Sequence, residues 1–188
     1  PWMKECDINP LLVSPEGLIS LDARIILHDA TMKWEDLPKP AIRPYPVQYV
    51  ENWEFKGHQN VLIRPIRPED EPLIVQFHKD LSQETIRQRY LKAVNYDERI
   101  AHDRLLRICF NDYDREISLV VALNREILGV IRFSKISGTS DATFALIIKD
   151  QWQNKGIGTK LMQKVLDVAK AEKTKTVHAQ MLSENFQM

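Results

Sequence analysis

Residues 148–159 read IKDQWQNKGIGT, and this stretch decides how the rest of the chain is interpreted. An apolar run ends at Ile148 and a helical pattern starts at Thr159, so the stretch connects a strand to a helix. Gly156 and Gly158 let the backbone approach a ligand closely and let amide N–H groups point outward. The first N–H groups of the helix add the positive end of its dipole. We interpret the stretch as a pyrophosphate cradle that needs no metal, with a glycine turn of purely structural purpose as the alternative.

The periodicity around this stretch predicts an α+β unit with a mixed, mostly antiparallel sheet flanked by helices. Short apolar runs predict strands, and apolar residues at helical spacing predict helices. The predicted strands span residues 61–66, 117–123, 127–134, 142–148 and 176–182, and the predicted helices span residues 68–81, 84–91, 100–108 and 159–172. The order is a strand, helices, a three-strand meander, a helix and a strand.

The composition excludes several classes of function. The chain has 188 residues with 26 basic and 26 acidic side chains, so we expect no nucleic acid as partner. No apolar run approaches the ~20 residues that span a bilayer, and no signal-peptide pattern is present, so we expect a cytoplasmic protein with no membrane partner. Cys6 and Cys109 cannot build a disulfide framework or a zinc site, and Cys109 is expected in the core.

The N-terminal third differs in pattern from the rest. Two apolar runs on either side of the turn at residues 14–17 predict a β-hairpin within residues 1–30. Four prolines between positions 38 and 46 predict an extended linker over residues 31–59. Residues 60–188 then carry the main unit.

Gln153-x-x-Gly156-x-Gly158 resembles the Q/R-x-x-G-x-G/A signature of the GNAT acyltransferases, and the element order over residues 60–188 is also similar to theirs. The resemblance implies a GNAT fold and acetyl-CoA as cosubstrate, with the pyrophosphate on the loop and the pantetheine arm along the preceding strand. Asn185 matches a family position near the thioester. The cofactor-binding residues that the resemblance implies are Leu146, Ile147, Ile148, Gln153, Asn154, Lys155, Gly156, Ile157, Gly158, Thr159 and Asn185.

The N-terminal residues resemble a second family. The sequence DINPLLV at residues 7–13, followed by LDAR at residues 21–24, is similar to the C-terminal end of the ATP-grasp domain of ADP-forming acyl-CoA synthetases. This resemblance implies that Asn9 and Asp22 bind Mg²⁺, whose ligands are oxygen atoms, but only within an intact ATP-grasp site. ATP and Mg²⁺ are therefore expected as cofactors only where the full synthetase-like region is active.

The succession of these two parts, joined by KPAIRPYP at residues 39–46, resembles the bacterial Pat-type protein lysine acetyltransferases. That resemblance implies an N-acetyltransferase that moves an acyl group from acetyl-CoA to protein lysine side chains. Its partners would be proteins with reactive lysines, acyl-CoA synthetases among them. Two alternatives stay open, namely a non-catalytic domain that senses acyl-CoA and a GNAT domain that acts on a small-molecule amine.

The strand before the glycine loop departs from the Pat-type pattern at the general base. The pattern there is Ala-Glu-Phe-Ala, whereas residues 142–145 read Ala-Thr-Phe-Ala, and Thr143 cannot accept a proton near neutral pH. Asp141 lies two residues earlier, about 7 Å along an extended strand, on the same face as Thr143 and within reach through a water. Asp141 is the candidate catalytic base, with a role as a turn residue as the alternative.

The run Arg87-Gln88-Arg89-Tyr90 falls on a predicted helix, and we interpret it as a solvated face or a wall on the substrate side. Because the chain starts with Pro1 and stops within a pattern at Met188, we expect a fragment whose GNAT domain is truncated at its C-terminus. Its last strand would then be an edge that pairs with a second copy.

Overall fold

The computed structural model describes residues 2–33, 36–38, 42–55 and 59–183. The chain divides into two compact units, Pro1–Arg43 and Pro44–Met188.

The first unit consists of two antiparallel ribbons. β1 (Met3–Ile8) pairs with β4 (Ala23–Leu27), and β2 (Leu11–Ser14) pairs with β3 (Gly17–Ser20). The β2–β3 pair is the predicted hairpin, whereas β1 and β4 extend it in a way the sequence did not indicate. Most apolar side chains of these four strands are exposed, as a ribbon without a second layer requires.

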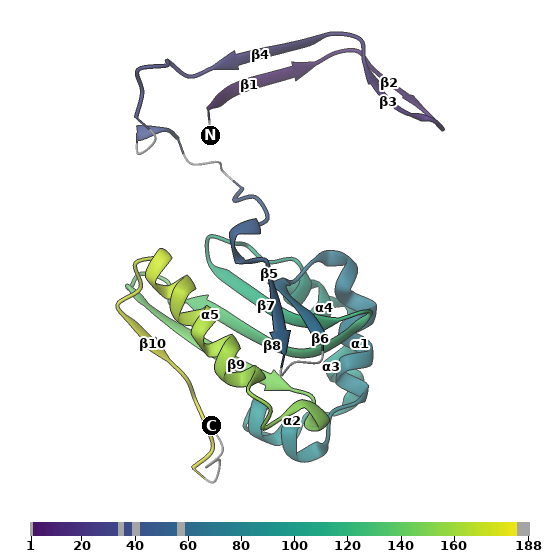
Figure 1. Ribbon diagram of the computed structural model, residues 1–188, viewed down its shortest axis with the longest axis vertical. Coiled ribbons are helices and arrows are strands. Elements are labelled where there is room, and N and C mark those ends of the chain that lie inside the picture. The colour runs from purple at the N-terminus through teal and green to yellow at the C-terminus, as the bar shows by residue number, and fades with distance from the viewer. Residues whose placement is uncertain (1, 34–35, 39–41, 56–58, 184–188) are drawn as a thin grey trace. The chain divides into compact units, whose positions relative to one another are not determined.

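The second unit is built on a six-stranded sheet in the order β10-β9-β8-β7-β6-β5 (Figure 1). The strands are β5 (Glu51–Phe55), β6 (Gln59–Pro65), β7 (Glu116–Leu123), β8 (Glu126–Lys135), β9 (Asp141–Ile148) and β10 (Thr176–His178). Neighbouring strands are antiparallel except β9 and β10, which are parallel. The predicted α+β class with a mixed, mostly antiparallel sheet is confirmed.

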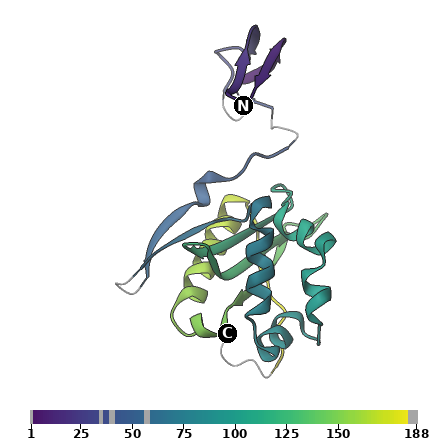
Figure 2. The ribbon, with the colours of Figure 1, turned by 90° about the vertical axis from the view of Figure 1, so that its right-hand side faces the viewer.

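Helices cover the two faces of this sheet (Figure 2). They are α1 (Glu71–Lys79), α2 (Gln83–Tyr90), α3 (Tyr96–Ile100), α4 (His102–Cys109) and α5 (Ile157–Ala171), with 3-10 turns η2 (Val47–Tyr49), η3 (Pro68–Asp70) and η4 (Asp150–Trp152). α5 packs on one face through Leu161 and Val165. On the other face Ile74 and Phe77 of α1 pack with Ile147 of β9. None of the helices in the described part of the chain is long and apolar enough to cross a membrane.

β9 and β10 pair at one end only. Thr176–His178 lies beside Asp141–Thr143, whereas Phe144–Ile148 has no strand partner on that side among the described residues (Figure 1). The backbone of the second half of β9 therefore faces an opening in the sheet. The predicted strand over residues 176–182 was too long, because its apolar pattern continues past the point where the two backbones diverge.

The predicted linker over residues 31–59 was also too long. The second unit starts at Pro44, and β5 forms an edge of its sheet by pairing with β6. Phe55 of β5 is buried in the core under α5, and Glu51 accepts a hydrogen bond from Lys160 of α5 at 2.6 Å. The prolines therefore mark the approach to an edge strand, and the sequence pattern of β5 is too short and polar to stand out.

Lys149 fixes the end of β9 to its surroundings. Its side chain is 2% exposed, and its ammonium group donates to Asp80 at 2.6 Å and to Glu126 at 2.8 Å. Burial alone would lower the pKa of Lys149, but the two carboxylates outweigh it and raise the pKa. The charged ammonium group thus joins α1, β8 and the chain that follows β9.

Replacing Lys149 by Met keeps the apolar stem and removes the charge. We expect the free energy of unfolding at pH 7 to fall by about 1–3 kcal/mol, because two neighbouring carboxylates lose their cation. Urea unfolding measures the change, with Lys79→Met, at an exposed lysine, as the control. A loss no larger than that of Lys79→Met would contradict the proposed anchoring role.

Candidate functional site

Two adjoining cavities lie beside β9. The first, which we call the turn cavity, has a volume of about 460 Å³ and is bounded by α2, the end of β9 and the start of α5. The second, which we call the arginine cavity, has a volume of about 450 Å³ and lies between the sheet and helices α1, α2 and α4. Arg89 and Ile147 line both, so the two spaces have walls in common.

The turn between β9 and α5 presents backbone N–H groups to the turn cavity. Asn154 and Gly156 have φ angles of 56° and 95°, in the left-handed region. A Cβ on Gly156 would meet no atom within 4 Å, so the φ angle and not packing requires glycine there. No side chain caps the N-terminus of α5, which leaves its first N–H groups and positive dipole end for a ligand. The turn therefore has the geometry of an anion cradle.

Side chains that follow β9 attach this turn to the start of α2. Asp150 accepts hydrogen bonds from the N–H of Ser82 at 2.9 Å, from its hydroxyl at 2.5 Å and from the hydroxyl of Thr85 at 2.8 Å. Gln153 donates to the Thr85 hydroxyl at 3.0 Å and to the carbonyl of Ile148 at 3.0 Å. Burial alone would raise the pKa of Asp150, but these hydrogen bonds outweigh it and lower the pKa. A charged Asp150 thus holds the turn and α2 together.

Comparison with known families identifies the domain that carries this turn. Residues 60–188, more than half of the chain, match the model of the acetyltransferase (GNAT) domain. The chain belongs to the GNAT acetyltransferases. The acetyltransferase PA5475 of Pseudomonas aeruginosa is 30% identical over 127 residues, which is 65% of this chain and 65% of that protein. The match thus spans slightly less than two thirds of the relative's length.

Solved GNAT structures share the fold of the second unit. The GNAT domain of S. lividans PAT superposes with a TM-score of 0.69 at 19% identity, over 76% of this chain and 84% of that one. The PaiA N-acetyltransferase from Thermoplasma acidophilum, solved in complex with coenzyme A, gives 0.54 at 17% identity, over 67% and 82%. These likenesses confirm the predicted GNAT fold. The family match begins at residue 60, so the ATP-grasp interpretation of residues 1–30 stays a prediction.

Most residues that the GNAT resemblance assigned to the cofactor do line the turn cavity. They are Leu146, Ile147, Ile148, Gln153, Asn154, Gly156, Gly158 and Thr159. Ile157, the first residue of α5, instead buries its side chain in the core. The ammonium group of Lys155 lies 4.8 Å from the ring centre of Trp152. Asn185 lies outside the described residues.

The turn cavity is also lined by side chains that the sequence did not assign to it. Thr85, Gln88 and Arg89 of α2 line it, as does Met162 of α5. The run at residues 87–90 gave a partial signal, since it predicted a solvated face or a substrate-side wall. Arg87 is exposed and pairs with Glu84, as a solvated face requires, whereas Arg89 lines both cavities. The interpretation of the run as a wall on the substrate side stays a prediction.

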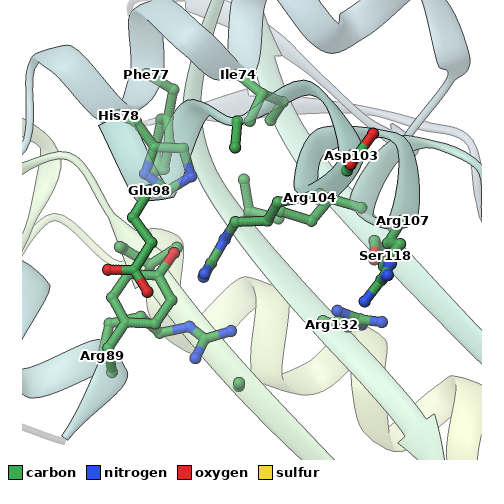
Figure 3. Close-up of a pocket in the computed structure, with 16 residues that line it drawn as sticks. Ile74, Phe77, His78, Arg89, Glu98, Asp103, Arg104, Arg107, Ser118 and Arg132 are labelled. Carbon is green, nitrogen blue, oxygen red and sulfur yellow. The ribbon is translucent and has the colours of Figure 1, made fainter. Parts of the chain in front are cut away.

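The arginine cavity is a cationic space on the side of β9 away from α5 (Figure 3). Arg89 of α2 and Arg104 of α4 lie over the ring of Tyr90, at 5.1 and 5.0 Å from its centre. Arg132 of β8 forms an ion pair with Glu116. Burial lowers the pKa of Arg89, and the positive charges of Arg132 and Arg104 lower it further.

His78 of α1 forms another wall of this cavity and is 4% exposed. Burial lowers its pKa to about 4, with further contributions from Arg99, Arg104 and Arg89. At pH 7 the imidazole is therefore neutral, and it adds no charge to the arginines around it.

The candidate base Asp141 lines neither cavity. It is the first residue of β9 and shares a face of that strand with Thr143 and Ala145. Ala145 lines the arginine cavity, whereas Asp141 lies four residues earlier, about 13 Å along the strand. The assignment of Asp141 stays a prediction.

The two residues that the ATP-grasp resemblance assigned to Mg²⁺ are neighbours. The backbone N–H of Asn9 donates to the carbonyl of Asp22 at 3.2 Å, where the β1–β4 ribbon ends. No group of three or more His, Cys, Asp or Glu side chains that could hold a metal occurs in the part of the chain that the structure describes. Two side chains alone leave most Mg²⁺ ligand positions to other groups, so their metal role stays a prediction.

His78 predicts how stability changes with pH. Because its pKa is about 4 when folded and about 6.5 when unfolded, the unfolded chain binds a proton first as the pH falls below 6.5. The free energy of unfolding should then fall by up to about 1.4 kcal/mol per pH unit between these values. Urea unfolding at pH 7 and pH 4.5 should show a larger loss for the wild type than for His78→Gln. Equal losses in the two proteins would refute this role of His78.

Proposed function

We propose that this GNAT domain binds acetyl-CoA in the turn cavity and transfers the acetyl group to an amine beside β9. The observation that carries the proposal is that two sets of backbone groups without secondary-structure partners lie at one end of β9. The first N–H groups of α5 would bind the pyrophosphate, and the unpaired edge of Phe144–Ile148 would bind the pantetheine arm as a neighbouring strand would. The PaiA relative, solved with coenzyme A, supports this choice of cosubstrate.

The chemistry needs few groups. The acceptor ammonium first loses a proton to a base, and the free amine attacks the thioester carbonyl carbon. The C–S bond then breaks, and a second proton passes from the nitrogen to the leaving thiolate, so that coenzyme A leaves as a thiol. Backbone N–H groups on the open side of β9 would polarise the carbonyl oxygen. The two cavities would hold donor and acceptor in contact, and such positioning replaces a bimolecular encounter.

We further propose that the acceptor is a lysine side chain of a partner protein, with acyl-CoA synthetases among the partners. The resemblance of residues 1–59 and the GNAT domain together to Pat-type acetyltransferases supports this acceptor. The fold shared with the GNAT domain of S. lividans PAT, at a TM-score of 0.69, is consistent with it. ATP and Mg²⁺ would act only in a complete synthetase-like region.

A second candidate acceptor is a small-molecule amine. The observation that favours it is the arginine cavity, whose volume of about 450 Å³ between helices and sheet is typical of a small-molecule site. Thr143 at the usual base position favours a third function, the sensing of acyl-CoA without turnover. Incubation with acetyl-CoA and cell extract, followed by mass spectrometry of peptides and small amines, distinguishes the three. Acetyl-lysine in proteins supports transfer to a protein lysine. An acetylated small amine without acetyl-lysine supports the small-molecule acceptor, and the absence of any product supports sensing without turnover. Either of these last two results excludes transfer to a protein lysine.

Gly158 tests the binding of acetyl-CoA. A Cβ there would sit 3.4 Å from Ile148 and 3.5 Å from Leu146, in ordinary contact, so Gly158→Val should fold while its methyl groups enter the turn cavity. We expect calorimetry to show at least a tenfold weaker affinity for acetyl-CoA with an unchanged circular dichroism spectrum. Gly138→Val, in an exposed turn where a φ of 76° makes a side chain strained, is the control for backbone strain away from the cavity. Unchanged affinity in Gly158→Val would exclude the turn cavity as the pyrophosphate site.

Asp141 and Glu98 are two carboxylates whose variants test the base. Asp141 is the sequence-based candidate, whereas Glu98 lines the arginine cavity. We propose Asp141, acting through water, and expect Asp141→Asn to lower kcat about a hundredfold while the affinity for acetyl-CoA is unchanged. Glu98→Gln should change kcat less than threefold. The reverse pattern would assign proton transfer to the cavity wall and contradict Asp141.

A further inference from the structure

The arginine cavity gathers buried polar atoms that have no hydrogen-bond partner. In the described part of the chain the buried side-chain atoms of this kind are His78 Nδ1, Arg89 Nε, Arg104 Nε, Ser118 Oγ and Trp152 Nε1, and all but the last belong to residues that line this cavity. They come from α1, α2, α4 and β7, so four separate elements contribute an unsatisfied group to one space. Buried polar groups in native proteins are nearly always hydrogen-bonded, which points to a polar ligand in the cavity.

The charges around this space identify the ligand as an anion. Once the Arg132–Glu116 pair is set aside, the charged walls are Arg89, Arg104, Arg107, Glu98 and Asp103. The three guanidinium groups therefore exceed the two carboxylates by one positive charge. No described carboxylate forms an ion pair with Arg89 or Arg104, whose guanidinium groups both extend into the cavity (Figure 3). Like charges brought together without a counterion are costly, and an anion between them would remove that cost.

The donor set fits a carboxylate better than a phosphate. A guanidinium group offers a planar pair of N–H donors that matches the two oxygens of a carboxylate. Glu98 and Asp103 at the same cavity would repel the second charge of a phosphate dianion. An excess of one positive charge suits a ligand with one negative charge.

The position of the cavity assigns this carboxylate to the acyl acceptor. The turn cavity already contains the glycine turn, and the arginine cavity adjoins it at Arg89 and Ile147. Ala145, on the same face of β9 as Thr143, also lines the arginine cavity. An acceptor that enters from this side would meet the thioester at β9, with its carboxylate toward α2 and α4.

We propose that the arginine cavity binds a carboxylate of the acceptor, so that the preferred acceptor is an amine with a carboxylate close to it. The inference rests on the proposed acetyl transfer and narrows its substrate class. The carboxylate belongs to an acidic residue beside the target lysine or to a free amino acid. Both sources present the same group to Arg89 and Arg104.

Acceptor competition is the direct test. Seven-residue peptides, blocked at both ends and containing one lysine, carry Glu at one of the positions −2 to +2 or Gln at the same position, and free L-amino acids form a separate pool. We expect at least one Glu peptide to have a kcat/KM about ten- to a hundredfold higher than its Gln counterpart, or one free amino acid to exceed its amide by the same factor. The difference should lie mainly in KM. Preference within the peptides identifies an acidic flanking residue, and preference for free amino acids identifies the other source. Equal kcat/KM for all Glu and Gln pairs, and for each amino acid and its amide, would overturn the proposal.

Variants connect the preference to the cavity. Arg104→Gln should reduce the Glu preference at least fivefold while the affinity for acetyl-CoA stays unchanged. Arg104→Lys, which keeps the charge but not the planar pair of donors, should give an intermediate value. Arg115→Gln is the matched control, because the side chain of Arg115 is 85% exposed and pairs with Asp112 outside the cavity. A preference that survives Arg104→Gln in a folded protein would contradict the assignment.

Two measurements separate this inference from the proposed function. Calorimetric titration of the favoured Glu and Gln compounds, with coenzyme A present, detects binding without turnover. Arg104-dependent binding of the Glu compound without any acetylation would reject acetyl transfer but uphold the carboxylate site. If succinyl-CoA is preferred to acetyl-CoA and Arg104→Gln abolishes that preference, the carboxylate belongs to the donor and the proposal is wrong.

Discussion

The ionic and polar ties between the end of β9 and helices α1 and α2 are the constraint on which the site depends. Lys149 pairs with Asp80 and Glu126, and Asp150 accepts three hydrogen bonds from Ser82 and Thr85. All of these contacts except the Lys149–Glu126 pair join residues that are more than sixty positions apart in the chain. Because the glycine turn follows directly, the positions of its N–H groups are set by these ties and not by the turn alone.

Helix α2 connects the two halves of the site for the same reason. Its first turn is held by Asp150, and its last turn places Arg89 between the turn cavity and the arginine cavity. One helix therefore forms part of the wall of both cavities. The open edge of β9 completes the arrangement, since the separation of β10 after His178 exposes strand backbone beside both cavities.

The sequence predicted the parts of this site that depend on local pattern. The glycine turn, the strand before it, the helix after it and the buried Cys109 follow from spacing and apolar periodicity, and the structure confirms them. The helix predicted over residues 100–108 agrees with α4 to within two residues, whereas α3 was not predicted. A helix of five residues is too short for its apolar spacing to show a period.

Contacts between residues that are far apart in the chain could not be predicted from the sequence. Nothing near Arg104 or Ser118 indicates that they face the same cavity as Arg89, because α4, β7 and α2 meet only in the folded chain. The sequence predicts a linker where β5 lies, because β5 is recognisable as a strand only through its pairing with β6. The end of β10 likewise depends on where its partner diverges.

An NMR titration of the ¹⁵N-labelled chain with acetyl-CoA tests the central claim most directly, because it reports on each backbone N–H separately. The account predicts that the largest shifts occur at Ile157, Gly158 and Thr159 and along Phe144–Ile148, with smaller ones in α2. Large shifts confined to other regions, with the first turn of α5 unchanged, would contradict it.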